Sequence, residues 1–423
     1  MASTLAEKIV ARACRRAQVR PGEIVTASID LLMMHDSGGP RRVASRLDTL
    51  GAKVWDPSRV VVVSDHFVPA VDIEGAEILA LTRRWALANG VRHYDAVGIC
   101  HVVLQEHGHV QPGAFCVGGD SHSPSGGAFG AFMMGVGSTD ITAALVTGEI
   151  WLEVPETVRV NWRGQLSAGV SAKDIMLFLC ANLGMDHENQ AFEFDGPAVR
   201  RMSMSERMTL CNMSAELGAV TGIVTADETT LKALELAGRP FVDDIGQWQS
   251  DPDATCMAKH DFDAAALEPQ IAAPHSPANS RPASAYGRIA IDQAYIGSCT
   301  GAKLADLHMA AEVLKGRKVA RGTRLLIAPA STEMTAQAAA DGTLQILTAA
   351  GAIVLPTGCG ACAGMGAGIV PAGEVCLATT ARNFKGRMGS PESQVYLGSP
   401  YSVAAGAVKG EICDPRELLL EAV

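Results

Sequence analysis

Short runs of β-branched residues alternate with longer segments of helical periodicity along most of the chain. The runs VVVV at Val60–Val63, RLLIA at Arg324–Ala328 and AIVL at Ala352–Leu355 have the length and composition of buried strands. Between the last two lies DGTLQILTAAG, which predicts a short helix ending at Gly351. The earlier segment AKLADLHMAAEVLKG repeats leucine and alanine at helical spacing and predicts a helix that ends before Gly316. Strand, helix and strand in this order predict parallel α/β layers.

The chain is long enough for more than one domain. Its 423 residues are 48% hydrophobic, which is sufficient for a large core. The stretch LEPQIAAPHSPANSRPASAYGR is rich in Pro, Ala and Ser and lacks periodicity, so it predicts a linker near residues 267–288. A second boundary is indicated near Val154 and Pro155. We therefore expect three domains, at residues 1–155, 156–285 and 286–423.

Charge and cysteine content restrict the class of protein. The formal net charge of -10 argues against a broad surface for nucleic acid or for anionic membranes. Eleven cysteines occur in a chain without a signal-peptide pattern or a membrane-length apolar run, which is typical of reduced thiols in the cytoplasm. The N-terminal segment TLAEKIVARACRRAQVRPGE is amphipathic and Arg-rich, but it carries Glu7 and continues into the globular pattern. We therefore expect a cytoplasmic protein without a targeting segment.

Three cysteines follow predicted strands in glycine-rich turns. Cys359 and Cys362 lie three apart in LPTGCGACAGMG, and Cys299 lies in YIGSCTGAK. Such turns form the rim where ligands bind in α/β folds, so the three thiols could converge there. Three thiolates fit a [4Fe-4S] cluster with one open iron, whereas structural zinc normally has four ligands. The spacing alone leaves three interpretations open: a metal or cluster, a redox pair, and buried or loop thiols.

A second set of candidate residues lies in the N-terminal half. Asp and His are adjacent in VVVVSDHFVPA, a His follows the apolar start of GICHVVLQEHG, and VGGDSHSPSGGAFGAF contains Asp, Ser and His together. An Asp beside a His can set its tautomer and raise its basicity, which suits general acid and base catalysis near pH 7. Each His alone could be an ordinary polar residue, but several at expected strand ends indicate a site. The candidates are Asp65, His66, His101, Asp120, Ser121 and His122.

Two further motifs carry polar side chains at informative spacings. In MTLCNMSAELGAVTG, Asn212 and Glu216 are four apart, which predicts that they share one face of a helix. In TTARNFKGRMGS, Arg382 and Arg387 lie in a glycine-containing loop. Because a guanidinium matches a carboxylate bidentately, this pair would suit a di- or tricarboxylate substrate. A solvated basic loop is the alternative.

Taken in order, these motifs resemble those of the aconitase superfamily, and within it the large subunits of 3-isopropylmalate dehydratases and their relatives. The resemblance extends from TLAEKI to YLGSPYSVAAGAVKGEICDP, essentially the whole chain. It rests on GICHVVLQEHGHVQPGAFCVGGDSH, GAFGAFMMGVGSTD, GSCT, GCGAC and RNFKGRMGSPE, which occur in the family's order. It implies an α/β protein of three α/β/α domains around a central cluster site, without the mobile fourth domain of single-chain aconitases.

The resemblance also implies roles for the candidate residues. Cys299, Cys359 and Cys362 would hold a [4Fe-4S] cluster whose unligated iron acts as a Lewis acid on the substrate's hydroxyl and carboxylate. A proton-transfer group would line the site, with His66 as the acid for the leaving hydroxyl. Substrate binding would involve Ser121, and the two arginines would hold carboxylates. The proton-transfer group implied in this way is Asp65, His66, His101, Asp120, His122 and Glu216.

The activity implied is that of a hydro-lyase that removes water from and returns it to a 2-hydroxy dicarboxylic acid, with isomerisation of 2- and 3-isopropylmalate as the first candidate. A separate small subunit would supply the mobile domain and the catalytic base, so we expect this chain alone to be inactive. Related hydratases of dimethylmalate, citramalate, maleate or homocitrate are the alternative.

Some positions depart from the family pattern. Gly301 and Ala381 stand where Asn is usual, Ser123 where Thr is common, and Ala361 where Pro is frequent. None of these changes removes a cluster ligand, but loss of two amides could alter cluster stability or substrate preference. Two other classes remain: an RNA-binding relative, which the net charge opposes, and a zinc-stabilised or redox protein, which metal analysis would identify.

Overall fold

The structure is a computed structural model and describes residues 2–420. These residues form two compact units, which we describe separately. The first combines the chain up to Asp95 with Cys100–Arg163 and Asp186–Phe262, and the second combines Ala96–Ile99, Gly164–Met185 and the chain from Asp263 onward. The division into three domains at residues 155 and 285 stays a prediction.

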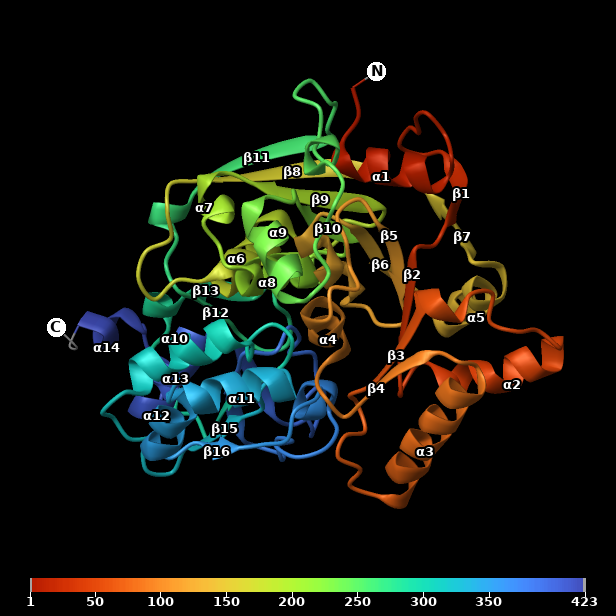
Figure 1. Ribbon diagram of the computed structural model, residues 1–423. Coiled ribbons are helices and arrows are strands. Elements are labelled where there is room, and N and C mark those ends of the chain that lie inside the picture. Colours follow the sequence, from red (N-terminus) through yellow and green to blue (C-terminus); the bar gives the residue numbers. More distant parts are fainter. Residues whose placement is uncertain (1, 421–423) are drawn as a thin grey trace. The chain divides into compact units, whose positions relative to one another are not determined.

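A five-stranded sheet lies in the first unit (Figure 1). Its strands are β2 (Leu31–His35), β3 (Val60–Ser64), β4 (Arg92–Asp95), β5 (Phe115–Gly118) and β6 (Phe132–Gly135). All four pairings are parallel, in the order β4-β3-β2-β5-β6, and β3 is the buried run predicted from the sequence. The helices and short 3-10 segments along this part of the chain are α1 (Leu5–Ala13), α2 (Pro40–Leu50), η1 (Pro57–Arg59), α3 (Ile73–Ala88), α4 (Cys100–Glu106), η2 (Ser123–Phe129) and α5 (Ser138–Thr147).

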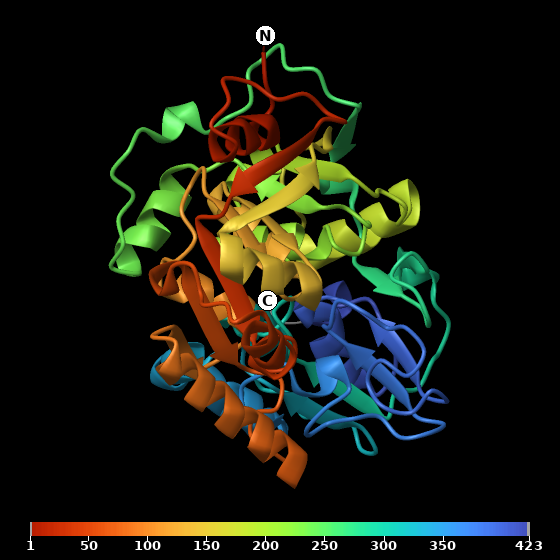
Figure 2. The same ribbon diagram turned by 90° about the vertical axis from the view of Figure 1, so that its right-hand side faces the viewer.

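Two smaller sheets complete the first unit. Strands β1 (Ile24–Ser28) and β7 (Glu149–Glu153) form an antiparallel pair, seen in red and yellow in Figure 2. A four-stranded sheet has the order β10-β9-β8-β11, with β8, β9 and β10 parallel. Its strands are β8 (Glu156–Arg163), β9 (Gln190–Asp195), β10 (Thr221–Val224) and β11 (Ala258–Asp263). The accompanying helices are α7 (Pro197–Arg200), α8 (Met204–Met213), α9 (Glu228–Leu236) and the 3-10 segment η3 (Ile245–Gln247).

The glycine-rich segment η2 is buried along its whole length and packs against α8 and β10. The backbones approach so closely that a Cβ on Gly127 would lie 1.8 Å from the carbonyl oxygen of Gly222. Glycine is therefore required at position 127. This packing positions the polar residues at both ends of η2.

The second unit is built on a seven-stranded sheet of order β13-β12-β18-β17-β14-β15-β16. The strands are β12 (Gln270–Ala272), β13 (Ser280–Pro282), β14 (Gln293–Ile296), β15 (Arg324–Ile327), β16 (Ile353–Val354), β17 (Val375–Ala378) and β18 (Gln394–Leu397). Pairing is parallel from β18 to β16 and antiparallel at β12 and β13. The helical segments are α6 (Ala172–Leu183), η4 (Ala264–Ala266), η5 (Ala283–Ala285), α10 (Leu304–Leu314), α11 (Thr332–Ala340), α12 (Thr343–Ala350), η6 (Gly360–Ala363), α13 (Pro400–Lys409) and α14 (Arg416–Leu420).

Most elements predicted around residues 300–355 are confirmed. The two expected helices are α10 and α12, and Gly351 ends α12 in the left-handed conformation with φ of 109°. The linker prediction at residues 267–288 is wrong. Strands β12 and β13 pair there, and β12 joins the large sheet through Ala272 and Leu397. Strands this short carry too few residues to display a period, so composition alone was misleading.

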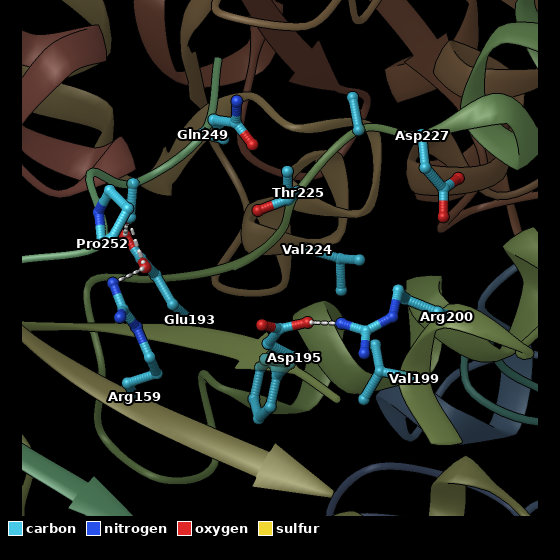
Figure 3. Close-up of a pocket in the computed structure, with 13 residues that line it drawn as sticks. Arg159, Glu193, Asp195, Val199, Arg200, Val224, Thr225, Asp227, Gln249 and Pro252 are labelled. Atoms are coloured by element: carbon cyan, nitrogen blue, oxygen red, sulfur yellow. Dashed lines mark hydrogen bonds and ion pairs between the residues drawn. The ribbon is translucent and has the colours of Figure 1, made fainter. Parts of the chain in front are cut away.

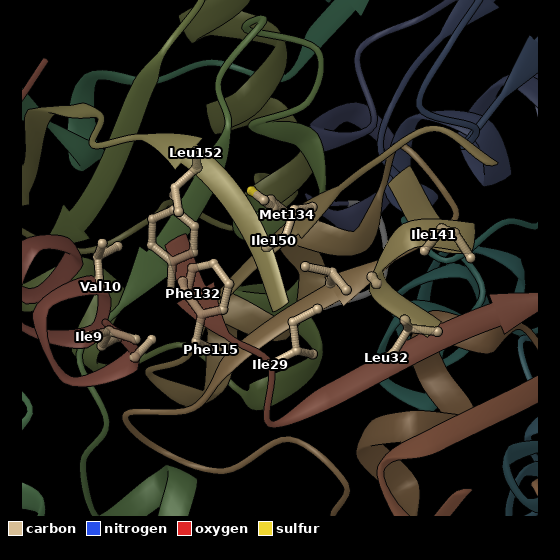
Figure 4. Packing of buried hydrophobic residues seen from close by; sticks show 14 of the residues in the cluster. Ile9, Val10, Ile29, Leu32, Phe115, Phe132, Met134, Ile141, Ile150 and Leu152 are labelled. Carbon is tan, nitrogen blue, oxygen red and sulfur yellow. The ribbon is translucent and has the colours of Figure 1, made fainter. Parts of the chain in front are cut away.

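The core of the first unit centres on two stacked aromatic rings. Phe115 and Phe132 are fully buried on paired strands, with ring centroids 5.3 Å apart. Figure 4 shows these rings beside Ile9 and Val10 of α1 and Leu152 of β7. Helix α1 is held by a capping box between Thr4 and Glu7, so its N-terminal amides are satisfied. The Arg-rich N-terminal segment therefore contributes to this core.

Among the described residues, no helix has the length and apolar character needed to cross a bilayer.

We expect Phe132→Ala to lower the free energy of unfolding by about 3–5 kcal/mol, because it removes a stacked ring from a closed core and leaves a cavity. Equilibrium denaturation followed by circular dichroism measures this change. Leu87→Ala is the matched control, since Leu87 is 85% exposed and its truncation should change stability by about 0.5 kcal/mol or less. Equal effects from the two variants would contradict the packing described.

Candidate active site

Parallel pairing brings polar side chains from three neighbouring strands to one edge of the five-stranded sheet. Asp65 and His66 directly follow β3, and Asp120 and His122 follow β5. Between these strands lies β2, which ends at His35. Carboxyl ends of adjacent parallel strands share an edge, so the residues that follow them meet. The convergence expected for this group is present.

Asp65 and His66 form a buried ion pair. Asp65 Oδ1 lies 2.6 Å from His66 Nδ1, and Asp65 Oδ2 accepts a hydrogen bond of 2.7 Å from the backbone N–H of Cys100. Cys100 begins helix α4, so this carboxylate also interacts with the positive end of that helix. Both oxygens are therefore satisfied, and His66 is held by its Nδ1 atom, which leaves Nε2 to act on another group.

The surroundings of His66 favour its charged form. Burial alone would lower the pKa of His66, but the charge and hydrogen bond of Asp65, with the charges of Asp120 and Asp36, raise it to about 9. Burial raises the pKa of Asp65, but the charge and hydrogen bond of His66 outweigh this effect and lower that pKa to about 2. His66 is thus an imidazolium at neutral pH, and its Nε2 carries a proton that it can donate.

Asp120 connects three histidines. Its Oδ1 lies 2.9 Å from His101 Nε2 and accepts a 2.8 Å hydrogen bond from the backbone N–H of His122. Its Oδ2 lies 3.9 Å from His66 Nε2. Burial opposes the ionised form of Asp120, yet these hydrogen bonds and charges hold its pKa well below the usual range. Asp120 is therefore a carboxylate that contacts a cluster of imidazoles.

His101 does not directly follow a strand, as the sequence suggested. It lies in the first turn of helix α4, and residues 96–99 separate that helix from β4. The side chain is buried and still reaches Asp120. In GICHVVLQEHG the helix begins at Cys100, and its residues are buried as far as Gln105.

Glu216 belongs to the site, but the helix expected to carry it ends earlier. Helix α8 ends at Met213, where the Ser214 hydroxyl donates to the carbonyl of Cys211 and tight turns follow. Glu216 lies in these turns, with Oε1 3.0 Å from His122 Nε2. Asn212 donates a 2.6 Å bond to Ser125 Oγ. The two residues therefore both reach the η2 region, although they do not share a helix face.

Sequence reasoning missed His35 and Asp36. The His35 ring stacks on His66 at 4.1 Å, and its Nε2 bonds the carbonyl oxygen of Gly119 at 2.9 Å. Asp36 accepts hydrogen bonds from the backbone N–H groups of His66 and Phe67. Burial and the charge of His66 lower the pKa of His35, so this ring is neutral beside a charged one. The signal was present, because LLMMHD places a His and an Asp at the end of a fully apolar run.

Ser121 lies between Asp120 and His122 in the same turn and is exposed. Its neighbours hold this turn firmly, since Ser123 Oγ donates a 2.7 Å bond to the carbonyl of Asp120. Ser121 therefore lies beside the polar group, and its role in substrate binding stays a prediction.

The second unit contains the three candidate cysteines. Cys299 follows β14, and Cys359 and Cys362 follow β16 in and beside η6. The Ser298 hydroxyl lies 3.6 Å from Cys299 Sγ and 3.4 Å from Cys362 Sγ, so it contacts both. Cys362 also donates its backbone N–H to the carbonyl of Cys359. The two cysteine loops thus meet at one edge of the sheet.

The distances between these thiols indicate which kind of metal group they could bind. Among the described residues, two groups have ligand atoms all within 4.8 Å of one another, and neither contains a cysteine. One zinc ion, with Zn–S bonds of about 2.3 Å, would bring three sulfurs closer than that. A cluster of several irons separates its ligands further, and soft thiolates are its usual ligands. The set of three cysteines therefore fits an iron–sulfur cluster better than a single zinc ion.

The arginine loop follows β17, at the same edge of this sheet. The buried amine of Lys173 donates to the carbonyls of Thr379 and Thr380 at 3.2 and 2.6 Å, which holds the start of the loop. Arg382 and Arg387 are both half-buried. The Nε atom of Arg387 is buried and without a hydrogen-bond partner in the described part of the chain. A half-buried guanidinium with an unused donor is suited to bind an anion.

Local packing explains why position 301 is a glycine. A Cβ at this position would lie 2.1 Å from the Cβ of Thr379. Thr379 itself binds the first cysteine loop, since its Oγ1 accepts a hydrogen bond from the Gly297 N–H at 2.9 Å. Ala381 is close to Thr379 in the sequence and is also buried, and its methyl group can make no hydrogen bond. The two departures from the family pattern thus lie in or beside a region where this chain packs tightly.

A separate pocket in the first unit lies near the ends of β9 and β10 (Figure 3). Its arginines are already paired, Arg159 with Glu193 at 3.4 Å and Arg200 with Asp195 at 2.5 Å. None of the residues predicted from the sequence to form a site lines this pocket. We therefore assign the catalytic candidates to the Asp and His cluster.

Comparison with known proteins agrees with this chemistry. Residues 7–287 and 279–410 match the Aconitase family (aconitate hydratase). The 3-isopropylmalate dehydratase large subunit 1 of Methanopyrus kandleri is 46% identical over 99% of this chain and 100% of its own length. The probable large subunit of Methanothermobacter thermautotrophicus and the large subunit of Moorella thermoacetica are each 44% identical over 99% of this chain and 100% of theirs. The structure of aconitase X from Thermococcus kodakaraensis has a TM-score of 0.49 at 15% identity, covering 87% of this chain and 89% of that one.

These matches place the chain in the class of iron–sulfur-dependent hydro-lyases. The chain belongs to the aconitase family, and its similarity to the relatives named above is that of a large subunit.

We expect Asp65→Asn to lower the pKa of His66 markedly from about 9, because the variant loses the charge that opposes the effect of burial. NMR titration of labelled histidine measures this pKa. By linkage, the stability that follows from the raised pKa of His66 is complete below its ordinary value of 6.5 and is lost as the pH rises through about 9. The stability that follows from the lowered pKa of Asp65 is complete above its ordinary value of 3.8 and is lost as the pH falls through about 2. Asp56→Asn, at an exposed carboxylate of the same unit, is the control and should leave the His66 titration unchanged. An unchanged titration in Asp65→Asn would refute the assignment.

Proposed function

We propose that this chain is the large subunit of a 3-isopropylmalate dehydratase, which interconverts 2- and 3-isopropylmalate by removing and returning water. The observation that carries the proposal is the full-length identity of 42–46% to proteins of that name. The Asp and His cluster and the three cysteines supply the chemical groups that such a reaction needs. Related acids differ only in the group beside the reacting carbons. The identity of the substrate is therefore the most specific part of the proposal.

A [4Fe-4S] cluster would be held by Cys299, Cys359 and Cys362. Three ligands leave one iron of such a cluster open, and the iron then supplies Lewis-acid chemistry to a hydroxyl and a carboxylate. Two of the three thiols are fully buried, and two of them contact the Ser298 hydroxyl. Such an enclosed, sulfur-rich environment supports this assignment.

His66 would protonate the leaving hydroxyl. Dehydration of a 2-hydroxy acid expels hydroxide, a poor leaving group unless a proton arrives with it. The pKa of about 9 keeps His66 charged at neutral pH, and its bond to Asp65 directs Nε2 away from that carboxylate. Asp65 would therefore serve to orient the ring and stabilise its charge.

Asp120, His101, His122 and Glu216 would maintain the charge balance of the cluster. Asp120 contacts His101 and His122, and Glu216 contacts His122 at the far side. These contacts hold each ring in one orientation, so that a proton can be passed without rearranging the protein.

Arg382 and Arg387 would bind the two carboxylates of the substrate, and Ser121 would add a hydroxyl contact. The unused Nε of Arg387 supports this role. Lys173 and the Thr379 backbone hold the loop that carries both arginines. Bidentate binding fixes the plane of a carboxylate, which orients the adjacent carbon for proton removal.

A separate small subunit would complete the enzyme with a mobile domain and the catalytic base. The designation of the relatives as large subunits supports this partner. The assembled enzyme would act in the cytoplasm, where its eleven free thiols remain reduced.

Replacement of any one of the three cysteines by alanine should abolish formation of the cluster, because each would hold one iron. Anaerobic reconstitution of the wild-type chain should give about four irons and four sulfides per chain, with broad absorption at about 400 nm. Cys256→Ala is the control, since Cys256 is a partly buried thiol of the other unit and should load normally. Zinc, or no metal, in the wild-type chain would overturn the cluster assignment.

With the small subunit added, we expect the highest kcat/KM on 3-isopropylmalate in a panel that also contains dimethylmalate, citramalate, maleate and homocitrate. Formation of the unsaturated acid, or its loss when maleate is hydrated, is followed by ultraviolet absorption. The chain alone should give no turnover. Better turnover of an acid without an isopropyl group would move the assignment to a related hydratase, a result for which Gly301 and Ala381 would be the first residues to examine.

A further inference from the structure

Tyr295 is a buried phenol whose hydroxyl has no hydrogen-bond partner. It lies on β14 and is 0% exposed, and its Oη makes no bond to any atom of the described chain. Burying a hydroxyl without a partner costs free energy, so such a group in a folded protein calls for an explanation. Phenylalanine would fill the same space without that cost.

The hydroxyl lies between the two loops that carry the candidate ligands. A Cβ on Gly297 would lie 2.6 Å from Tyr295 Oη, and a Cβ on Gly360 would lie 3.8 Å from it. Gly297 is two residues before Cys299, and Gly360 directly follows Cys359. Gly297 must be glycine here, because its Cβ would also lie 2.3 Å from the Tyr295 ring. The phenol therefore ends between the two loops that carry the cysteines.

Sulfur atoms are the charged neighbours of this hydroxyl, and within the described chain none of them accepts a hydrogen bond from it. Cys359, Cys362 and Cys376 are the neighbours whose charges would act on the Tyr295 hydroxyl. Thr379, which could compete for it, already bonds the backbone of Gly297 through its own hydroxyl. A phenol O–H is a good donor, and thiolate or sulfide sulfur carrying negative charge accepts from it.

We propose that the Tyr295 hydroxyl donates a hydrogen bond to sulfur of the bound iron–sulfur cluster, either to a cluster sulfide or to the ligating sulfur of Cys359 or Cys362. The inference rests on the ligand set proposed above. The bond stabilises the more negative, reduced form of the cluster and raises its reduction potential, which is among the properties that hydrogen bonds to sulfur determine. Tyr295 is thus a positioning and tuning residue and takes no part in proton transfer to substrate.

Tyr295→Phe tests this proposal by removing one oxygen atom and leaving the ring. The full chain and the variant are reconstituted anaerobically, and iron and sulfide are counted for both. The reduction potential is then titrated by electron paramagnetic resonance. We expect equal loading and a more negative potential in the variant, together with faster loss of visible absorption in air. Tyr286→Phe is the control, because the Tyr286 hydroxyl has a protein acceptor, the carbonyl of Ile271 at 2.8 Å.

A measurement on the wild-type chain alone can still overturn the proposal if the variant loads poorly. Transfer to deuterium oxide should shift the iron–sulfur stretching bands in the resonance Raman spectrum, because an exchangeable proton bonds sulfur, and Tyr295→Phe should lose part of this shift. A loaded wild-type chain without the shift, or with the same shift and potential as the variant, overturns the Tyr295 proposal only. A wild-type chain that assembles no cluster overturns both the ligand set and the Tyr295 proposal.

Discussion

Parallel strand pairing is the constraint on which the chemistry of both units depends. In the first unit, β3, β2 and β5 are adjacent and end together, so Asp65, His66 and Asp120 meet at one edge. In the second unit, the loops after β14 and β17 likewise leave one edge, and they carry Cys299 and the arginines. Antiparallel pairing would send alternate loops to opposite edges and would separate these residues.

Burial of the Asp and His cluster is tolerated because its charges compensate each other. An isolated buried carboxylate or imidazolium would lose its charge, since desolvation penalises the ionised form. Here Asp65 lies against His66, and Asp120 lies against His101. Each carboxylate also accepts a backbone N–H, from Cys100 or from His122. The same contacts that permit burial therefore fix the orientation of the rings and keep His66 charged, which is the property a proton donor requires.

Sequence reasoning was most successful where a residue's role depends on its own strand or turn. The runs at residues 60–63 and 324–328 are strands, and Asp65 follows its strand directly. It was less successful where hydrogen bonds end an element, as at Met213, which places Glu216 outside the helix. Short strands paired with distant partners were also missed. Ala272 pairs with Leu397, far along the chain, and such a pairing produces no periodic pattern in the local sequence.

The sequence by itself determined the α/β class, the family and the residue types of the chemistry, because strand and helix periodicity and short motifs are local properties. Only the tertiary structure decided which side chains meet. His122 contacts Glu216, which is 94 residues away in the sequence, His35 stacks on His66, and the Tyr295 side chain ends between two cysteine loops. Such contacts depend on packing between elements distant in the chain, and burial then sets the charge and hydrogen bonding of each group.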